Sequence, residues 1–524
     1  MPLDSDPLRP RITLPQGTLI GIQQYGEYPN PVDAFLGIPY AQPPTGALRF
    51  RPPVKVDPSS RVIDASAFGP RAPAKLFVAI GPKLEESEAC LTANVFRQAG
   101  GSQCGGGLPV AIYMHAGAFA RGNAAMHDTA SVVGWSAAPF VAVSFGYRIG
   151  ALGFLPSTLS AKEGALNLGL KDQVLLMEWV QEDIQHFGGD RENVTLVGLS
   201  AGAHSIGHHL LNYEEGKKPL FHRVVMESGA PTSRAVRHYK AEIHEEQFKA
   251  FLQAVECPVD TPEAEIFPYL RSLPMEVIAA AQTKVFYAYN PSLRPIDAWR
   301  EGKWHKVPIM TGFNGNEGSL YVNKKMDSSA EFTDFWKTLL PQLSEADVAT
   351  INDLYPDPEL HRDSIYKEDR LEVGRMYKRI EAAYAHYAYV APVRQMAHYA
   401  GAEVPVYLYH WALTKSVVNG AAHGENMLYE VRDAGICARS PAQGELSRVL
   451  HAYITRFICT GDPNEILGKK SGCGVIWEQH RGDKPKKMIF GRDNKELIGG
   501  GVGEPAEVID DVWTKEESDF GGRR

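Results

Sequence analysis

Ser200 is the residue of this chain whose type and neighbours most clearly indicate chemistry. It stands in the sequence Gly-Leu-Ser-Ala-Gly at positions 198–202, between an apolar run expected to be a strand (194–197) and an expected helix (203–212). A strand-to-helix turn this tight requires small neighbours and holds the serine hydroxyl above the edge of a sheet. It also brings the backbone N–H of Ala201 to a helix N-terminus, where an oxyanion would be stabilised. The segment predicts a nucleophilic serine; the alternative interpretation is a glycine-rich turn with a helix-capping serine.

A second segment of small residues follows another expected strand. Positions 113–119 read Tyr-Met-His-Ala-Gly-Ala-Phe and come at the end of an apolar run at 108–114. Small residues let a backbone approach a ligand, and their N–H groups can then complete an oxyanion-binding site. By itself, such a segment is more typical of an ordinary turn.

The elements around these two segments alternate between strands and helices. Strands are expected at 108–114, 139–145, 194–197, 223–226, 307–310 and 405–408, and helices at 172–187 and 203–212. This alternation predicts an α/β fold with a mostly parallel sheet covered by helices on both faces. The stretches 233–300 and 325–400 indicate helical insertions that roof the sheet. We therefore expect one domain over residues 1–524, ending in a polar, poorly ordered tail at about 500–524.

Composition narrows the possible partners and locations. The net charge of −8 and the pI of about 6.1 argue against a nucleic-acid or anionic-membrane partner, since both need a concentrated basic surface. The first residues do not resemble a signal peptide, and no run approaches the ~18 apolar residues of a membrane span. We expect a cytoplasmic protein with mostly reduced thiols. The oligomeric state stays open.

Several separated blocks of the chain resemble the type-B carboxylesterase/lipase family, which also contains the cholinesterases. The resemblance covers almost the whole chain and is more specific than any single motif. It rests on the blocks 35–41, 48–50, 87–91, 147–154, 167–173 and 187–190, the last of which leads into the serine turn. It implies the α/β-hydrolase fold.

The resemblance also implies partners for the serine. The family's acid lies in an Asn-x-x-Glu-Gly element, which here makes Glu317 the acid. The family's base is a His followed by a small residue, which here makes His423 the base. The order Ser200, Glu317, His423 is that of α/β-hydrolases. Without the family, a lone Glu is usually a surface charge and one His among 17 is usually structural.

Residue-by-residue matching extends to the surroundings of this triad. The oxyanion donors should be the N–H groups of Gly117, Ala118 and Ala201, with Ala116 departing from the family's glycine. Ser228 matches a buried serine close to the acid, and Phe119 is a candidate substrate-binding residue.

Two further departures from the family concern other sites. Position 72 is Ala where the family has a disulfide cysteine, so Cys90 lacks its family partner. The segment between these positions has no Trp, which argues against a choline site.

Together these features predict a serine carboxylic-ester hydrolase that acts through an acyl-enzyme on small to medium esters, of the secondary-metabolite or xenobiotic kind. Two alternatives remain open: an acyltransferase or lactone-forming or lactone-opening enzyme with the same triad, and a non-catalytic binding domain, against which the intact triad argues. No cofactor and no metal are predicted. His204, His208 and His209 share a helix, but the HExxH pattern and a third ligand are missing.

Overall fold

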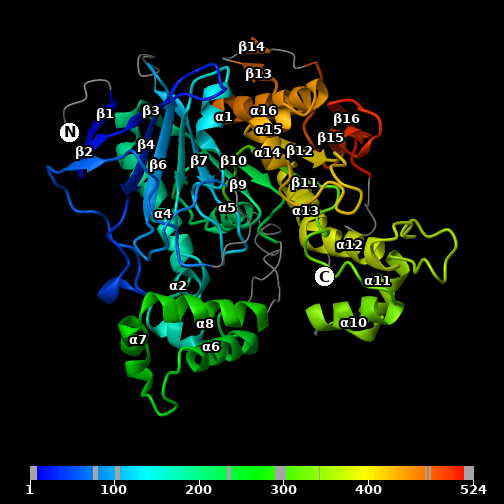
Figure 1. Cartoon of the computed structure of the whole chain (residues 1–524), viewed down its shortest axis with the longest axis horizontal. Helices are drawn as coiled ribbons and strands as arrows, with labels where there is room; N and C mark the ends of the chain where they lie inside the picture. The colour runs from blue at the N-terminus through cyan, green and yellow to red at the C-terminus, as the bar shows by residue number, and fades with distance from the viewer. Residues whose placement is uncertain are drawn as a thin grey trace.

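A mixed sheet of eleven strands runs through the described part of the chain (Figure 1). The structure is a computed structural model that describes residues 9–74, 81–100, 107–232, 238–288, 303–340, 343–466, 469–470 and 474–512. In spatial order the strands are β16 (Ala506–Asp510), β15 (Lys486–Phe490), β12 (Val406–Trp411), β11 (Ile309–Asn314), β10 (Arg223–Glu227), β9 (Gly189–Leu199), β7 (Leu108–Met114), β8 (Val141–Phe145), β6 (Thr92–Gln98), β4 (Val32–Pro39) and β3 (Ile22–Gln24).

The centre of the sheet, from β15 to β8, is parallel throughout. The outer strands β16, β6, β4 and β3 pair antiparallel with their neighbours. The prediction of an α/β-hydrolase sheet, mostly parallel, is therefore confirmed. Residues 194–197, expected as a short strand, form only part of β9, which begins at Gly189 and ends at Leu199.

Side chains of the parallel strands alternate between two apolar layers, because successive residues of a strand point to opposite faces. On β7, Ile112 packs into one layer with helices α4 (Leu168–Asp183), α5 (Ala201–Leu211) and α13 (Ala391–Ala400). Its neighbour Tyr113 packs into the other layer with α1 (Thr129–Trp135) and α16 (Pro441–Thr460). Both faces of the sheet are thus covered, which explains why its strands read as continuous apolar runs.

Two groups of helices follow the carboxyl ends of neighbouring strands. After β10 come α6 (Glu242–Ala254), α7 (Glu263–Ser272) and α8 (Met275–Ala288), which form their own apolar cluster with α2 (Gly150–Gly153) and α3 (Thr158–Lys162). After β11 come α10 (Ser329–Leu339), α11 (Glu345–Leu354), α12 (Tyr377–Ala385) and the π-helix η5 (His386–Val390). Figure 1 shows the two groups as separate bodies below the sheet. They occupy the stretches expected to be helical insertions, of which 233–237, 289–300 and 341–342 lie outside the described residues.

The two ends of the sequence contribute strands that the sequence analysis did not predict. The first 100 residues contribute β3, β4 and β6 to the main sheet and a small second sheet of β1 (Arg11–Leu14), β2 (Gly17–Ile20) and β5 (Val62–Asp64). The region expected as a poorly ordered tail contains β16, which pairs antiparallel with β15. Pairing with an existing sheet edge satisfies the backbone of this polar segment, and that partner is invisible to composition. Residues 513–524 lie outside the described part.

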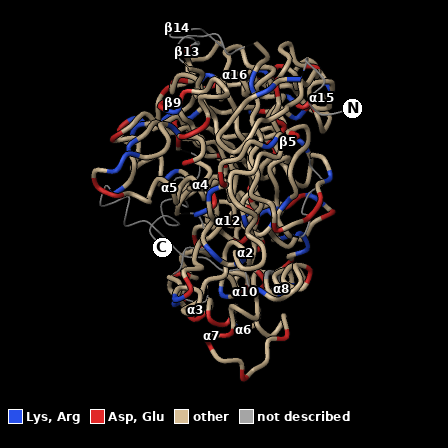
Figure 2. The backbone as a smooth tube through the Cα atoms, turned by 90° about the vertical axis from the view of Figure 1, so that its left-hand side faces the viewer, with Lys and Arg blue, Asp and Glu red and all other residues tan. Residues whose placement is uncertain are grey.

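Among the described residues, no helix is long and apolar enough to cross a bilayer. Figure 2 shows basic and acidic segments interspersed along the backbone, with acidic stretches on α6 and α7.

Candidate active site

The turn between β9 and α5 places Ser200 in a strained conformation. Its φ of 55° and ψ of −117° lie in a region that L-residues rarely occupy, which costs about 1–3 kcal/mol. Surrounding contacts maintain this conformation. The Ser200 N–H donates to the Glu227 carbonyl at 2.9 Å, and a Cβ on Gly198 would lie 2.6 Å from the Gly202 carbonyl carbon. The small residues predicted for the turn are therefore required by close backbone approach.

Glu317 and His423 meet although 106 residues separate them. Glu317 follows β11 and is fully buried; its Oε1 accepts the Asn314 N–H at 2.7 Å. Its Oε2 lies 2.5 Å from Nδ1 of His423. A carboxylate at Nδ1 fixes the tautomer that carries its proton there, so that Nε2 is the basic nitrogen.

The other nitrogen of His423 is buried and has no hydrogen-bond partner among the described residues, Ser200 included. Aromatic rings hold the imidazole: Tyr389 lies 4.5 Å away between ring centroids, and Tyr321 lies 5.5 Å away, edge-on. Nε2 is thus available to take up a proton, and contact with a serine hydroxyl in such sites often tightens only when substrate binds.

The segment after β7 turns through three consecutive residues with positive φ. These are Gly117 at 128°, Ala118 at 53° and Phe119 at 59°. The segment closes on itself, because the Gly117 carbonyl accepts from the N–H groups of Ala120 and Arg121 at 3.1 and 3.0 Å. No acceptor is present within the described part of the chain for the N–H groups of Gly117 and Ala118, nor for that of Ala201 at the start of α5.

Contacts on both sides hold this loop (residues 115–122), which is called the oxyanion loop after the role predicted for it from the sequence. His115 stacks on Tyr147 at 4.2 Å between centroids, and the Tyr147 hydroxyl donates to the His115 carbonyl at 2.9 Å. Burial lowers the pKa of His115 to about 4, so its ring stays neutral. Gly122 faces Ala116, the departure from the family's glycine, so closely that a Cβ on Gly122 would lie 2.2 Å from the Ala116 carbonyl oxygen; position 122 therefore requires glycine.

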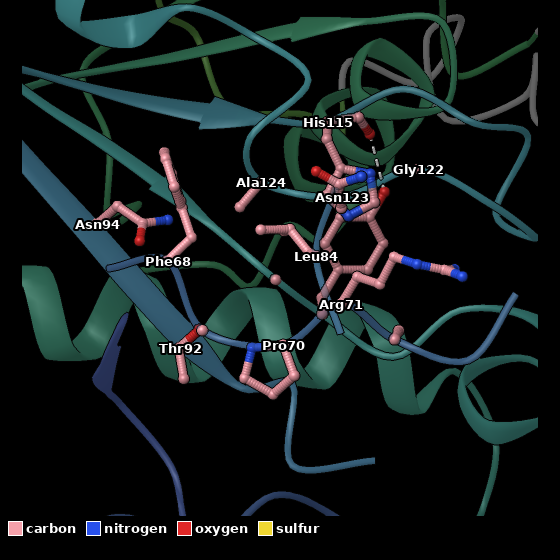
Figure 3. A pocket seen from close by; sticks show the side chains of 14 residues that line it. Phe68, Pro70, Arg71, Leu84, Thr92, Asn94, His115, Gly122, Asn123 and Ala124 are labelled. Atoms are coloured by element: carbon pink, nitrogen blue, oxygen red, sulfur yellow. Dashed lines mark hydrogen bonds between the residues drawn. The ribbon is translucent and has the colours of Figure 1, made fainter. Parts of the chain in front are cut away.

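A small cavity lies between this loop and the segment 68–72. Figure 3 shows His115, Gly122 and Asn123 on one side and Pro70 and Arg71 on the other. Its volume of about 10 Å³ suffices for one water molecule. It is too small to hold an ester.

Ser228 lies in the core next to the serine turn. It is fully buried with a φ of 48°, its N–H donates to the Gly312 carbonyl at 2.9 Å, and its hydroxyl has no partner among the described residues. The neighbouring Glu227 is also buried, and its carboxyl accepts from the Asn426 amide at 2.6 Å. Burial, with Glu430 adding in the same direction, raises the pKa of Glu227 well above its ordinary value. Sequence reasoning missed Glu227, whose contacts no local pattern indicates.

Phe119 and the histidines of α5 have separate surroundings. Phe119 is half-buried, 5.0 Å from Phe154 and 6.5 Å from His204 between centroids. His209 of α5 has a structural role, since its Nε2 lies 2.8 Å from the Gln173 side-chain oxygen. No group of His, Cys, Asp or Glu that could hold a metal occurs within the described ranges. Cys90 is a free, buried thiol, whereas Cys104 and Cys473 lie outside the described residues.

Comparison with known proteins identifies the family. A model described as the carboxylesterase family matches residues 9–499. The chain belongs to this family. It is accordingly an enzyme of the serine carboxylic-ester hydrolase class.

Relatives of this carboxylesterase come from fungi and from a mammal. It is 33% identical to secreted lipase 4 of Gibberella zeae over 84% of this chain and 81% of that protein. It is 27% identical to a secreted triacylglycerol lipase of the same fungus over 93% and 87%, respectively. It is 28% identical to a pyrethroid hydrolase of Mus musculus over 83% and 80%. Two of these relatives are named as secreted, so the prediction of a cytoplasmic location finds no support in them.

Proposed function

We propose that this carboxylesterase hydrolyses small to medium carboxylic esters through an acyl-enzyme on Ser200. In the first step, Nε2 of His423 takes the Ser200 proton as Oγ attacks the ester carbonyl. Glu317 orients the ring and stabilises the imidazolium. The imidazolium then protonates the departing alcohol, and water, activated by the same nitrogen, cleaves the acyl-enzyme. The 2.5 Å contact between Glu317 and His423 is the observation that carries this proposal.

The N–H groups of Gly117, Ala118 and Ala201 would bind the oxyanion of each tetrahedral intermediate. Three features support this role: the positive φ values of the loop, the position of Ala201 at the first turn of α5, and the lack of an internal acceptor for these donors in the described structure. Loss of one such donor typically lowers kcat by about 10²- to 10³-fold.

Aromatic side chains favour apolar ester groups. Tyr321 and Tyr389 flank the His423 ring, and Phe119, within the oxyanion loop, packs against Phe154. Rings of this kind bury apolar surface with little loss of conformational entropy. The names of the relatives, two lipases and a pyrethroid hydrolase, agree with apolar esters as the substrate class.

The test is hydrolysis of p-nitrophenyl esters from acetate to palmitate, together with labelling by a fluorophosphonate probe. We expect one probe molecule per chain, bound at Ser200, and a Ser200→Ala variant slowed by roughly 10⁵- to 10⁶-fold. A folded chain that neither turns over any ester nor reacts with the probe would disprove the proposal. Product analysis with added alcohols separates hydrolysis from acyl transfer.

A further inference from the structure

A second buried carboxylate touches the turn that carries the acid. Glu381 belongs to α12, in the helical insertion after β11, and is 5% exposed. Its Oε1 accepts the N–H of Gly318, the residue after Glu317, at 3.1 Å. Its Oε2 accepts from the side-chain amide of Asn316, the residue before Glu317, at 3.2 Å. One carboxylate thus holds both neighbours of the acid.

The same Asn316 connects this carboxylate to the segment that carries the base. Its side-chain oxygen accepts the Ala421 N–H at 3.0 Å, and its own N–H donates to the Ala421 carbonyl at 2.9 Å. Ala421 stands two residues before His423. A continuous chain of hydrogen bonds therefore runs from Glu381 through Asn316 to the base segment.

The packing around this chain leaves little room for adjustment. A Cβ on Gly318 would lie 2.2 Å from the Glu381 carbonyl oxygen, so α12 rests directly on the acid turn. A Cβ on Gly420 would lie 2.0 Å from the Asn316 side-chain oxygen. Because close-packed elements transmit displacement rather than absorb it, a change at Glu381 shifts the turn that it holds.

We propose that Glu381 is a positioning residue whose ionised carboxylate keeps Glu317 and His423 in register, so that ester hydrolysis requires its deprotonation. This inference rests on the proposed function of Ser200 and its two partners. The donors that face Glu381 are a backbone N–H and an amide, and both bind a carboxylate more strongly than a neutral carboxyl group. A protonated Glu381 would also present a hydrogen to one of these two donors.

Burial and the neighbouring groups bring the titration of Glu381 close to neutral pH. Burial raises the pKa of Glu381 to about 7, and the nearby Glu317 acts in the same direction. The two hydrogen bonds oppose the shift, as does Arg370 on the loop before α12. Arg370 is itself paired with Glu368 at 2.6 Å, and its guanidinium lies over the ring of Tyr377, at the start of α12. Above pH 7 the carboxylate is the main form, and below pH 7 the neutral acid is.

We expect activity at low pH to require the loss of two protons, one from His423 and one from Glu381. A triad in which only His423 must be deprotonated gives log kcat/KM a limiting slope of about one. A required Glu381 carboxylate adds a second proton, so the limiting slope at low pH rises to about two. The rate of fluorophosphonate labelling at Ser200 should show the same steepness, since it reads the nucleophile without depending on the choice of ester.

The experiment compares wild type, Glu381→Gln, Glu381→Asp and Asp347→Asn between pH 5 and 9, with folding checked by thermal unfolding. In the Gln variant the amide oxygen accepts one hydrogen bond, but its NH₂ group faces the other donor. We expect its kcat to fall roughly 10- to 100-fold at pH 8 with KM little changed, and its acid slope to fall to about one. The Asp variant keeps a titrating carboxylate and a slope of about two. Asp347, a buried carboxylate of α11 that caps its own helix through Ser344, is the matched control and should leave the slope unchanged.

Labelling of Ser200 tests the proposed function, whereas the acid slope tests the role of Glu381. No labelling of wild type at Ser200 would remove the proposed function itself. Normal labelling with a slope of one in wild type would overturn the role of Glu381, even if the Gln variant did not fold. A slope of two that persists in a folded Gln variant would overturn it equally.

Discussion

Replacement of Gly202 by alanine would separate the serine turn from the oxyanion loop. A Cβ at this position would lie 2.0 Å from the Met114 carbonyl oxygen, at the end of β7, and 2.9 Å from its carbon. Cβ atoms do not approach heavy atoms closer than 3.0 Å, so α5 and the end of β7 must part by about 1 Å. Ala201 lies on one of these elements, whereas Gly117 lies just beyond the other.

The expected loss follows from this displacement. A misplacement of about 1 Å in a catalytic site costs on the order of 10²-fold in rate, and overpacking costs about 1–3 kcal/mol in stability. We expect kcat/KM of Gly202→Ala on p-nitrophenyl butyrate, and its rate of fluorophosphonate labelling, to fall together by about 10²-fold. The variant should still unfold cooperatively, at a lower Tm.

Gly444 offers a matched control, because it lies in the first turn of α16, where a Cβ would meet its nearest atom at 3.4 Å, an ordinary contact. Gly444→Ala should keep wild-type activity and gain about 0.5–1 kcal/mol in stability, as expected for alanine over glycine in a helix. If Gly202→Ala also kept wild-type kcat/KM, the close approach of Met114 would not position the oxyanion donors, and the reasoning would fail.

Three further predictions concern the triad and the buried charges. Glu317→Gln should lower kcat by about 10⁴-fold while the fold persists, because the amide no longer fixes the tautomer of His423; ester turnover and circular dichroism test this. Arg148→Met should lower the free energy of unfolding by about 3–5 kcal/mol in urea titrations, because Asp172, fully buried and 2.7 Å from the guanidinium, would lose its partner. Burial lowers the pKa of His451 from 6.5 to about 4. Between these pH values the unfolded chain binds a proton at this histidine and the folded chain does not. The free energy of unfolding therefore decreases as the pH falls through 6.5 toward 4. At pH 5, His451→Gln should therefore gain roughly 2 kcal/mol relative to its effect at pH 8, and an equal effect at both pH values would refute the assignment.

The local parts of this enzyme could be predicted from the sequence alone. The turn at Ser200 depends on five consecutive residues, and its small neighbours are needed because backbones approach within one turn of chain. The parallel centre of the sheet follows from apolar runs that alternate with helical spacing, because a strand buried on both faces must be apolar throughout. Glu317 and His423 were reached by resemblance to a family, since neither residue has a local pattern of its own.

Other features were decided by the tertiary structure. Glu227 and Glu381 look like ordinary charged residues in the sequence, yet both are buried, the first next to Ser200 and the second against the acid turn. The hydrogen-bond partners of these two carboxylates lie far away along the chain. β6 and β16 pair antiparallel with the two edges of the parallel centre, β8 and β15, which exist only in the folded sheet. Short-range spacing determines which conformations a segment can adopt, whereas the burial of a carboxylate and the pairing of an edge strand depend on surfaces that exist only once the chain has folded.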